Sequence, residues 1–220
     1  MNNIELRQTK DGSYTYYNTQ FGEHYHSVEG AYTESLHIYI NNGLKLINKS
    51  NITIFEMGFG SGLNALLTFY YAQKLSLKIK YIALEKYPLP FHLVEKYPLP
   101  SFLDELHSIF YQMHYIEGNS SIELSNNFVF AKVIGDMQEY VFKEKIDLCY
   151  YDAFSYSKQP ELWTKEIFEK IYQAMNFGGM LLTYSSKGEV KRVLREVGFE
   201  VKRFKGAGSK RHSLRCIKTN

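Results

Sequence analysis

The stretch from Ile52 to Ala72, ITIFEMGFGSGLNALLTFYYA, constrains the fold of this chain more than any other feature. It begins with a β-branched and aromatic run, Ile52 to Met57, which predicts a buried strand. Three glycines then follow at every second position: Gly58, Gly60 and Gly62. From Asn64 onward, leucines and tyrosines recur at spacings of three and four and predict a helix. Because glycine turns with positive φ and carries no Cβ, this order presents backbone N–H groups and a helix N-terminus to a ligand.

The glycine spacing narrows the class of ligand. A dinucleotide fingerprint would be G-x-G-x-x-G, whereas G-x-G-x-G resembles the first motif of S-adenosylmethionine-dependent methyltransferases. Three close glycines alone also occur in ordinary turns. A second predicted strand, Lys80 to Leu84, ends in Glu85, where a carboxylate can accept hydrogen bonds from ribose hydroxyls. A single acid at a strand end can instead be a solvated charge, but the two features together favour a nucleoside-bearing cofactor.

Composition excludes several classes of protein. The 220 residues are enough for one domain with a full core and no disulfides. The two cysteines, Cys149 and Cys216, fall in predicted strands, which favours a reduced cytoplasmic protein. The N-terminus MNNIELRQTK has no apolar core, and no apolar run approaches the roughly 18 residues of a membrane span. We therefore expect neither export nor a membrane partner.

Charge is distributed unevenly along the chain. Residues 187–220 carry 11 Lys/Arg and 3 Glu, a net charge of +8, whereas the preceding 186 residues carry 15 basic and 20 acidic groups. A basic C-terminal sector on an otherwise acidic protein suggests a polyanionic partner. A solvated charged face explains the same count equally well.

The N-terminal 45 residues are predicted to form an extension on a methyltransferase domain spanning residues 46–220. Short strands are expected at Tyr14 to Tyr17 and Glu23 to Ser27, as a hairpin outside the main sheet, followed by a helix from Gly30 to Ile40. His24 and His26 share one face of the second strand. Because no further ligand follows at suitable spacing, the sequence predicts no metal site.

The remainder of the chain alternates between strands and helices, which predicts a mainly parallel sheet covered on both faces. The expected helices are Ser101 to His114, a segment starting near Met137, Pro160 to Ala174 with Gly178-Gly179 beyond its end, and Gly188 to Val197. The expected strands are Ser121 to Leu124, Phe128 to Ile134, Ile146 to Tyr151, Met180 to Tyr184, Glu200 to Phe204 and Leu214 to Lys218.

Two acidic residues follow predicted strands on the ligand edge of this sheet. Asp136 is placed to accept from an adenine amino group, or alternatively to cap the helix after it. Asp152 opens the loop AFSYSKQPELW, whose aromatic side chains and lysine can hold a flat base. Trp163 can instead be a core residue of the following helix.

Several motifs together give the chain a specific resemblance. EMGFGSGLNAL, the ALE ending at Glu85, DAFSYSKQPELW, the late GAGSKR and the N-terminal YHSVEGAYTES resemble the methyltransferases of the MnmC and MnmD type over nearly the whole chain. The resemblance implies a class I fold, Rossmann-like, with a mainly parallel seven-stranded sheet, helices on both faces and an N-terminal β-hairpin. It implies S-adenosyl-L-methionine as cofactor and the tRNA anticodon arm as partner.

The implied reaction is methylation of the primary amine of 5-aminomethyluridine, or its 2-thio form, at the wobble position. Other enzymes would have to install the aminomethyl group. For N-methylation, the enzyme mainly has to place a neutral amine in line with the activated methyl group. A free amine is largely protonated near pH 7, and Asp152 is a poor proton acceptor if its pKa stays near about 4, so a positioning role is favoured. A methyltransferase for a small-molecule or protein amine, and a non-catalytic RNA-binding module, stay open as alternatives.

The resemblance also assigns residues. Asp152 would be the catalytic residue. The glycines would approach the methionine part of the cofactor, Glu85 the ribose and Asp136 the adenine. The full cofactor-binding set is Tyr25, Glu34, Gly58, Gly60, Gly62, Asn64, Glu85, Lys86, Asp136, Met137, Asp152 and Phe154. The substrate- or tRNA-binding set is Phe154, Lys158, Trp163, Lys205, Lys210, Arg211 and Arg215. Four positions depart from the family pattern: Tyr156 for proline, Gln159 for asparagine, and His212 and Ser213 for glutamate and methionine.

Overall fold

The computed structural model describes residues 3–208 and 211–219. In these residues an eight-stranded sheet runs through the molecule in the order β10-β11-β9-β8-β4-β5-β7-β6. Its parallel centre consists of β4 (Asn51–Met57), β5 (Lys78–Glu85), β7 (Phe128–Ile134), β8 (Ile146–Tyr151) and β9 (Met175–Thr183). The chain moves from β4 outward through β5 to β7 and then returns to β8 on the other side of β4. That reversal opens a crevice beyond the carboxyl ends of β4 and β8, where open α/β sheets bind ligands.

Three antiparallel strands complete the sheet. β6 (Ser120–Ser125) pairs with β7 at one edge, and the hairpin of β10 (Phe199–Lys205) and β11 (His212–Lys218) pairs with β9 at the other. The described sheet therefore has eight strands, where the family resemblance implied seven, and each of the eight overlaps a strand expected from the sequence. The additional strand is β6, which the turn at Asn126-Asn127 folds back along β7 to form the edge of the sheet.

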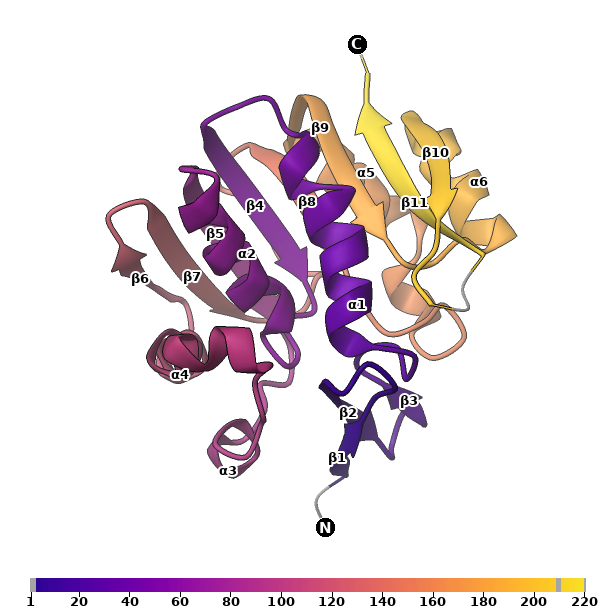
Figure 1. Ribbon diagram of the computed structural model, residues 1–220. Helices are drawn as coiled ribbons and strands as arrows, with labels where there is room; N and C mark the ends of the chain where they lie inside the picture. Colours follow the sequence, from indigo (N-terminus) through magenta and orange to yellow (C-terminus); the bar gives the residue numbers. More distant parts are fainter. Residues whose placement is uncertain (1–2, 209–210, 220) are drawn as a thin grey trace.

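Helices cover both faces of the sheet (Figure 1). One face packs under α2 (Leu63–Lys74), α4 (His107–Tyr115) and the segment continuing α1 (Ala31–Ser35), and the other under α5 (Lys165–Ala174) and α6 (Gly188–Val197). Strand residues alternate between the two cores: Ile54 faces the α2 side, and Phe55 faces the α5 side. This alternation follows from the two-residue period of a strand, and it explains why the central strands are apolar throughout.

The N-terminal extension is a three-stranded sheet and not a hairpin, because β1 (Ile4–Gln8) pairs with β2 (Tyr14–Asn18) in addition to β3 (Glu23–His24). It lies beyond the carboxyl ends of the parallel strands, at the bottom of Figure 1. Two tyrosine hydroxyls bond it to the segment around α3 (Phe91–Val94): Tyr16 donates to the Leu93 carbonyl at 2.7 Å, and Tyr97 donates to the Tyr14 carbonyl at 2.6 Å. The small sheet is thereby fixed over the ligand edge.

Several expected boundaries are wrong. The expected helix from Gly30 to Ile40 is a short α1 followed by a π-helical segment, Leu36–Asn41. The expected helices at 101–114 and 160–174 each begin with a 3₁₀ turn, Ser101–Leu106 and Pro160–Leu162. Residues 136–145 contain no helix, and Gly178-Gly179 lie within β9, which begins at Met175.

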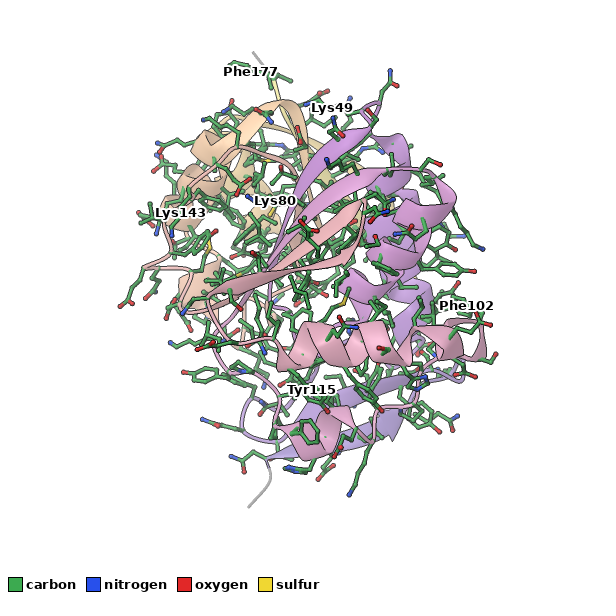
Figure 2. All side chains as sticks on the ribbon, turned by 90° about the vertical axis from the view of Figure 1, so that its left-hand side faces the viewer. Lys49, Lys80, Phe102, Tyr115, Lys143 and Phe177 are labelled. Atoms are coloured by element: carbon green, nitrogen blue, oxygen red, sulfur yellow. The ribbon has the colours of Figure 1, made fainter. Side chains whose placement is uncertain are left out.

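The end of the molecule opposite the small sheet carries Phe177 and Lys49, labelled at the top of Figure 2. No helix in residues 3–208 or 211–219 is long and apolar enough to cross a membrane. Over the same residues, no group of three or more His, Cys, Asp and Glu side chains is arranged to hold a metal ion.

Candidate active site

A cavity of about 380 Å³ lies between the carboxyl edge of the main sheet and the N-terminal sheet. That volume lies within the range of small-molecule and cofactor sites. One side of the cavity, the sheet wall, is formed by residues at the ends of β4, β5 and β8: Met57, Gly58, Phe59, Gly60, Leu84, Glu85, Asp152 and Ala153. The N-terminal wall consists of Asn18, Phe21, Glu23, His24, Tyr25 and His26.

The glycine turn forms the floor of the sheet wall, and close contacts require glycine at two positions. Gly58 has φ +87°, and a Cβ there would lie 2.8 Å from the carbonyl oxygen of Asp152. Gly60 has φ +51°, and a Cβ there would lie 2.8 Å from the ring of Tyr25. Gly62 also has positive φ but forms the N-cap of α2 and does not line the cavity. Two of the three predicted glycines therefore expose main chain to the cavity.

Glu85 faces the cavity from the end of β5, as its predicted ribose role requires. One carboxylate oxygen accepts from the Gly60 N–H at 2.9 Å and the other from the Tyr87 N–H at 2.8 Å. Lys86 also lines the cavity and donates to Asp136 at 2.7 Å. This bond with Lys86 lowers the pKa of the Asp136 carboxyl. Asp136 itself lies outside the cavity lining, and it accepts from the Gln138 N–H without capping a helix.

Asp152 lies at the end of β8 with its side chain 8% exposed. Its Oδ2 accepts a 2.8 Å hydrogen bond from Asn64 Nδ2 and lies 3.9 Å from His26 Nδ1. The Tyr39 hydroxyl lies beside the same carboxylate. Burial raises the pKa of Asp152, against the opposing influence of His26. Asn64 lies behind the cavity and positions Asp152, which differs from its predicted contact with the cofactor.

Behind Asp152 lies a second, fully buried carboxyl group. Glu56, within β4, accepts from Asn64 Nδ2 at 3.0 Å, and burial raises its pKa well above the ordinary range. A carboxyl in this environment is held in its protonated form. Asn64 thus joins a neutral acid inside the sheet to the acid at its edge.

The N-terminal wall contributes residues that the sequence analysis missed. Glu23 Oε2 accepts from the backbone N–H and the hydroxyl of Ser155, at 3.0 and 2.9 Å, and so ties the loop after Asp152 to the small sheet. The ring of Phe154 contacts Phe21 with centroids 4.9 Å apart and Tyr25 at 5.2 Å. The aromatic residues in the loop after Asp152 are the one sequence signal for these contacts. The contacts join residues more than 100 positions apart in the chain, so local patterns do not predict them.

Other predicted side chains vary in position. Tyr25, Glu34 and Phe154 line the cavity, and Glu34 Oε2 accepts from the Ser27 N–H at 2.8 Å. Met137 is fully buried in the α5-side core and does not line the cavity. The prediction that Trp163 contacts substrate is wrong: the side chain is 1% exposed, and its Nε1 donates to the Phe154 carbonyl at 2.9 Å. Trp163 supports the loop from beneath.

Three of the predicted basic residues, Lys205, Arg211 and Arg215, lie on the β10–β11 hairpin. The Lys205 carbonyl contacts His37 Nε2 at 2.6 Å, and Gly208 packs so closely on Glu29 that a Cβ would lie 2.8 Å from its side chain. Since Glu29 lines the cavity, the tip of the hairpin reaches the cavity rim. Lys205 and Arg211 are exposed, whereas Arg215 is half-buried. Lys210 lies outside the described residues. Lys158 is exposed in the loop after Asp152.

Comparison with known proteins identifies the family. A family model described as S-adenosyl-L-methionine-dependent methyltransferase matches residues 101–219, more than half of the chain. The chain belongs to this family. The cofactor is therefore S-adenosyl-L-methionine, and the exposed main chain at Gly58 and Gly60 beside the Glu85 carboxylate fits a nucleoside of this kind.

Similar proteins cover almost the whole chain. The tRNA 5-methylaminomethyl-2-thiouridine biosynthesis bifunctional protein MnmC of Idiomarina loihiensis is 33% identical over 89% of this chain and 36% of its own length. The protein of the same name from Pseudoalteromonas atlantica is 30% identical over 90% of this chain and 31% of its own. The crystal structure of MnmC2 from Aquifex aeolicus superimposes with a TM-score of 0.84 at 28% identity, covering 99% of this chain and 71% of that one. The chain thus spans about a third of the length of these curated relatives.

Proposed function

We propose that this methyltransferase N-methylates the primary amine of 5-aminomethyluridine, or its 2-thio form, at the wobble position of tRNA. The observation that carries the proposal is the position of Asp152. Its carboxylate is buried in the same cavity as the glycine turn, and its carbonyl packs against Gly58. A carboxylate at that point can hold an amine next to the part of the cofactor that binds the turn. The names of the MnmC relatives support a thiouridine of tRNA as substrate.

The cofactor supplies a methyl group on a sulfonium, which needs no further activation. The work of the protein is to orient the amine and exclude water. Asp152 would accept a hydrogen bond from the amine, with Asn64 and the Tyr39 hydroxyl fixing the carboxylate. Glu23 and Glu34 also face the cavity, so that its polar lining suits a cationic group. Phe154, held between Phe21 and Tyr25, would stack on the uracil ring.

The anticodon arm would contact the exposed cations at the cavity rim. Lys205 and Arg211 lie on a hairpin whose tip packs on Glu29, and Lys158 lies in the loop after Asp152. Such contacts position a phosphate backbone without reading sequence. We expect Arg211→Ala to lower the slope of log affinity against log salt by about 1. Lys143, an exposed lysine of the lining of a separate groove beside α5 and labelled in Figure 2, provides a matched control: Lys143→Ala should leave the slope unchanged.

The deciding experiment combines purified protein, S-adenosyl-L-methionine and tRNA from cells that accumulate the aminomethyl nucleoside. Nucleoside mass spectrometry should show loss of the aminomethyl form and gain of its N-methylated product. Methylation of free amines or protein amines in preference to this tRNA would overturn the proposal. In the cell, the reaction would take place in the cytoplasm, after the enzymes that install the aminomethyl group.

A further inference from the structure

His26 occupies a position in the cavity that the proposed function does not yet use. It follows β3, its imidazole is 6% exposed, and it lines the cavity beside Asp152. Its backbone N–H donates to Thr15 Oγ1 at 2.9 Å, which anchors it to β2. Its Nε2 lies 2.9 Å from Ser61 Oγ, within the glycine turn. One imidazole therefore joins the N-terminal wall, the cofactor-binding turn and the acidic residue of the sheet wall.

The distance between His26 and Asp152 fits a third atom between them. Nδ1 and Oδ2 are 3.9 Å apart, too far for a direct hydrogen bond. For an amine nitrogen about 2.8 Å from each of these atoms, the angle Nδ1···N···Oδ2 would be about 90°. Two N–H bonds of an ammonium group, which diverge by a similar angle, can therefore point at the two atoms. With its proton on Nε2, donated to Ser61 Oγ, His26 presents the Nδ1 lone pair to such a nitrogen.

We propose that His26 Nδ1 is the base that removes a proton from the acceptor amine, while Asp152 holds the same nitrogen. The inference rests on the proposed amine substrate and deepens it. An ammonium nitrogen gives one proton to Nδ1, so the imidazole becomes a cation beside the Asp152 carboxylate and the nitrogen gains a free lone pair. After methylation that nitrogen is a secondary ammonium, and the proton on His26 passes to water when the product leaves. Charge and protons balance without any further reactant.

The groups around this pair favour a cation in the cavity. Four further residues line the cavity with His26 and Asp152: Glu34 on α1, Glu23 on β3, Glu85 at the end of β5 and Tyr184 after β9. Tyr39 on the π-helical segment lies beside the carboxylate. Among the described residues, the lysine of the lining, Lys86, is paired with Asp136 at 2.7 Å. The acidic surroundings stabilise both an incoming ammonium group and the protonated imidazole that replaces it.

The test compares wild-type protein with His26→Asn across pH 6 to 9.5, on the aminomethyl tRNA. At pH 7 we expect kcat to fall about 100-fold or more, the scale of a lost general base. At pH 9 the fraction of free amine is about 100 times larger than at pH 7, since a model amine has a pKa of about 10.4, and the loss should shrink at least tenfold. Added imidazole should restore part of the activity at pH 7. His92→Asn, an exposed histidine on α3, is the matched control.

Four readouts separate a base from a structural residue. Calorimetry should give His26→Asn the same affinity for S-adenosyl-L-methionine as wild type, and thermal unfolding should show that it folds. Ser61→Ala, which removes the Nε2 partner but keeps the imidazole, should displace the acidic limb of the pH profile. In wild type loaded with S-adenosylhomocysteine, the Nδ1 nuclear magnetic resonance of His26 should shift when the aminomethyl nucleoside is added.

Two results overturn the inference without touching the proposed function. One is a variant whose loss of kcat is the same at every pH, and the other is a variant that keeps wild-type activity at pH 7. If wild-type protein methylates no amine at all, the proposed function and the inference are both overturned.

Discussion

On one side of the cavity, Gly58, Gly60 and Glu85 lie at the ends of two parallel strands. On the other side, Glu23 lies on β3 of the N-terminal sheet and His26 directly follows that strand. The sheet wall presents mostly backbone to the cavity, because Gly58 and Gly60 are positions at which a Cβ atom would collide with a neighbouring residue. The N-terminal wall presents side chains: a carboxylate, an imidazole and several aromatic rings.

This difference suits the two walls to different ligands, the sheet wall to the cofactor and the N-terminal wall to the acceptor. Main-chain amides and a strand-end acid suit a nucleoside cofactor common to many methyltransferases. Side chains carried by an extension suit the acceptor, because they can change without disturbing the cofactor site. The comparison predicts that changes in the two walls have separable effects on cofactor and acceptor.

Asp152 lies where the two walls meet, and its replacement should have the largest effect. Asp152→Asn keeps the shape and can still accept from Asn64, but removes the charge that holds a cationic amine. We expect kcat to fall at least about 100-fold, with affinity for tRNA and cofactor nearly unchanged. Single-turnover kinetics and calorimetry measure the two quantities. Loss of cofactor affinity as large as the loss of kcat would place Asp152 in the cofactor site alone.

Gly60 connects the walls, because the missing Cβ lets the Tyr25 ring approach within 2.8 Å of its position. Gly60→Ala should displace Tyr25 and weaken binding of S-adenosyl-L-methionine about tenfold, equivalent to about 1.4 kcal/mol. Gly178→Ala is the matched control, since Gly178 has φ +75° but no atom within 4 Å of its Cβ position. Both variants should lose about 1–3 kcal/mol of stability from backbone strain. Equal cofactor affinities in the two would refute the contact argument.

Glu23 tests the N-terminal wall on its own. Glu23→Ala removes both hydrogen bonds to Ser155 and frees the loop that carries Phe154. We expect KM for tRNA to rise about fivefold, about 1 kcal/mol, the net scale of a typical hydrogen bond, while cofactor affinity stays constant. Glu5→Ala, which breaks an exposed pair with Arg7 on the same small sheet, is the control and should leave KM unchanged. A change in cofactor affinity in Glu23→Ala would contradict the division between the walls.

The same division explains what the sequence could predict. The order of strands and helices, the glycine turn and the acids at 85 and 152 follow from local patterns, because backbone geometry demands particular residues at particular spacings. His26 and Glu23 have no local signal: a histidine and a glutamate on a short strand are ordinary until the fold brings them to Ser61 and Ser155. Trp163 is open to two interpretations for the same reason, since the chain alone does not say which side of a loop is buried, and the structure agrees with the core alternative.

The smallest expected effect on catalysis concerns Glu56, the buried acid behind the sheet wall, whose replacement is expected to change the stability of the fold. Its pKa is raised in the folded protein by burial, so between the unfolded pKa of about 4.3 and the folded value the native state binds more protons than the unfolded state. Its contribution to stability is therefore complete below that range and declines as pH rises. Glu56→Gln imitates the protonated form and can still accept from Asn64. We expect equal stability at pH 4 and a variant more stable than wild type at pH 8, because only the wild type has to keep a proton on the buried side chain.

Asp147→Asn is the control of opposite sign. Burial opposes ionisation there, but Lys49, the Thr53 N–H and Asn176 bond the carboxylate and leave its pKa lowered, so the variant should be less stable than wild type at pH 8. Denaturant unfolding at both pH values measures the differences. A Glu56→Gln variant that loses stability at pH 8 would mean that Glu56 is ionised in the folded protein. Asn64 would then bridge two carboxylates, and the acceptor amine would have to supply the positive charge that compensates the second anion near Asp152.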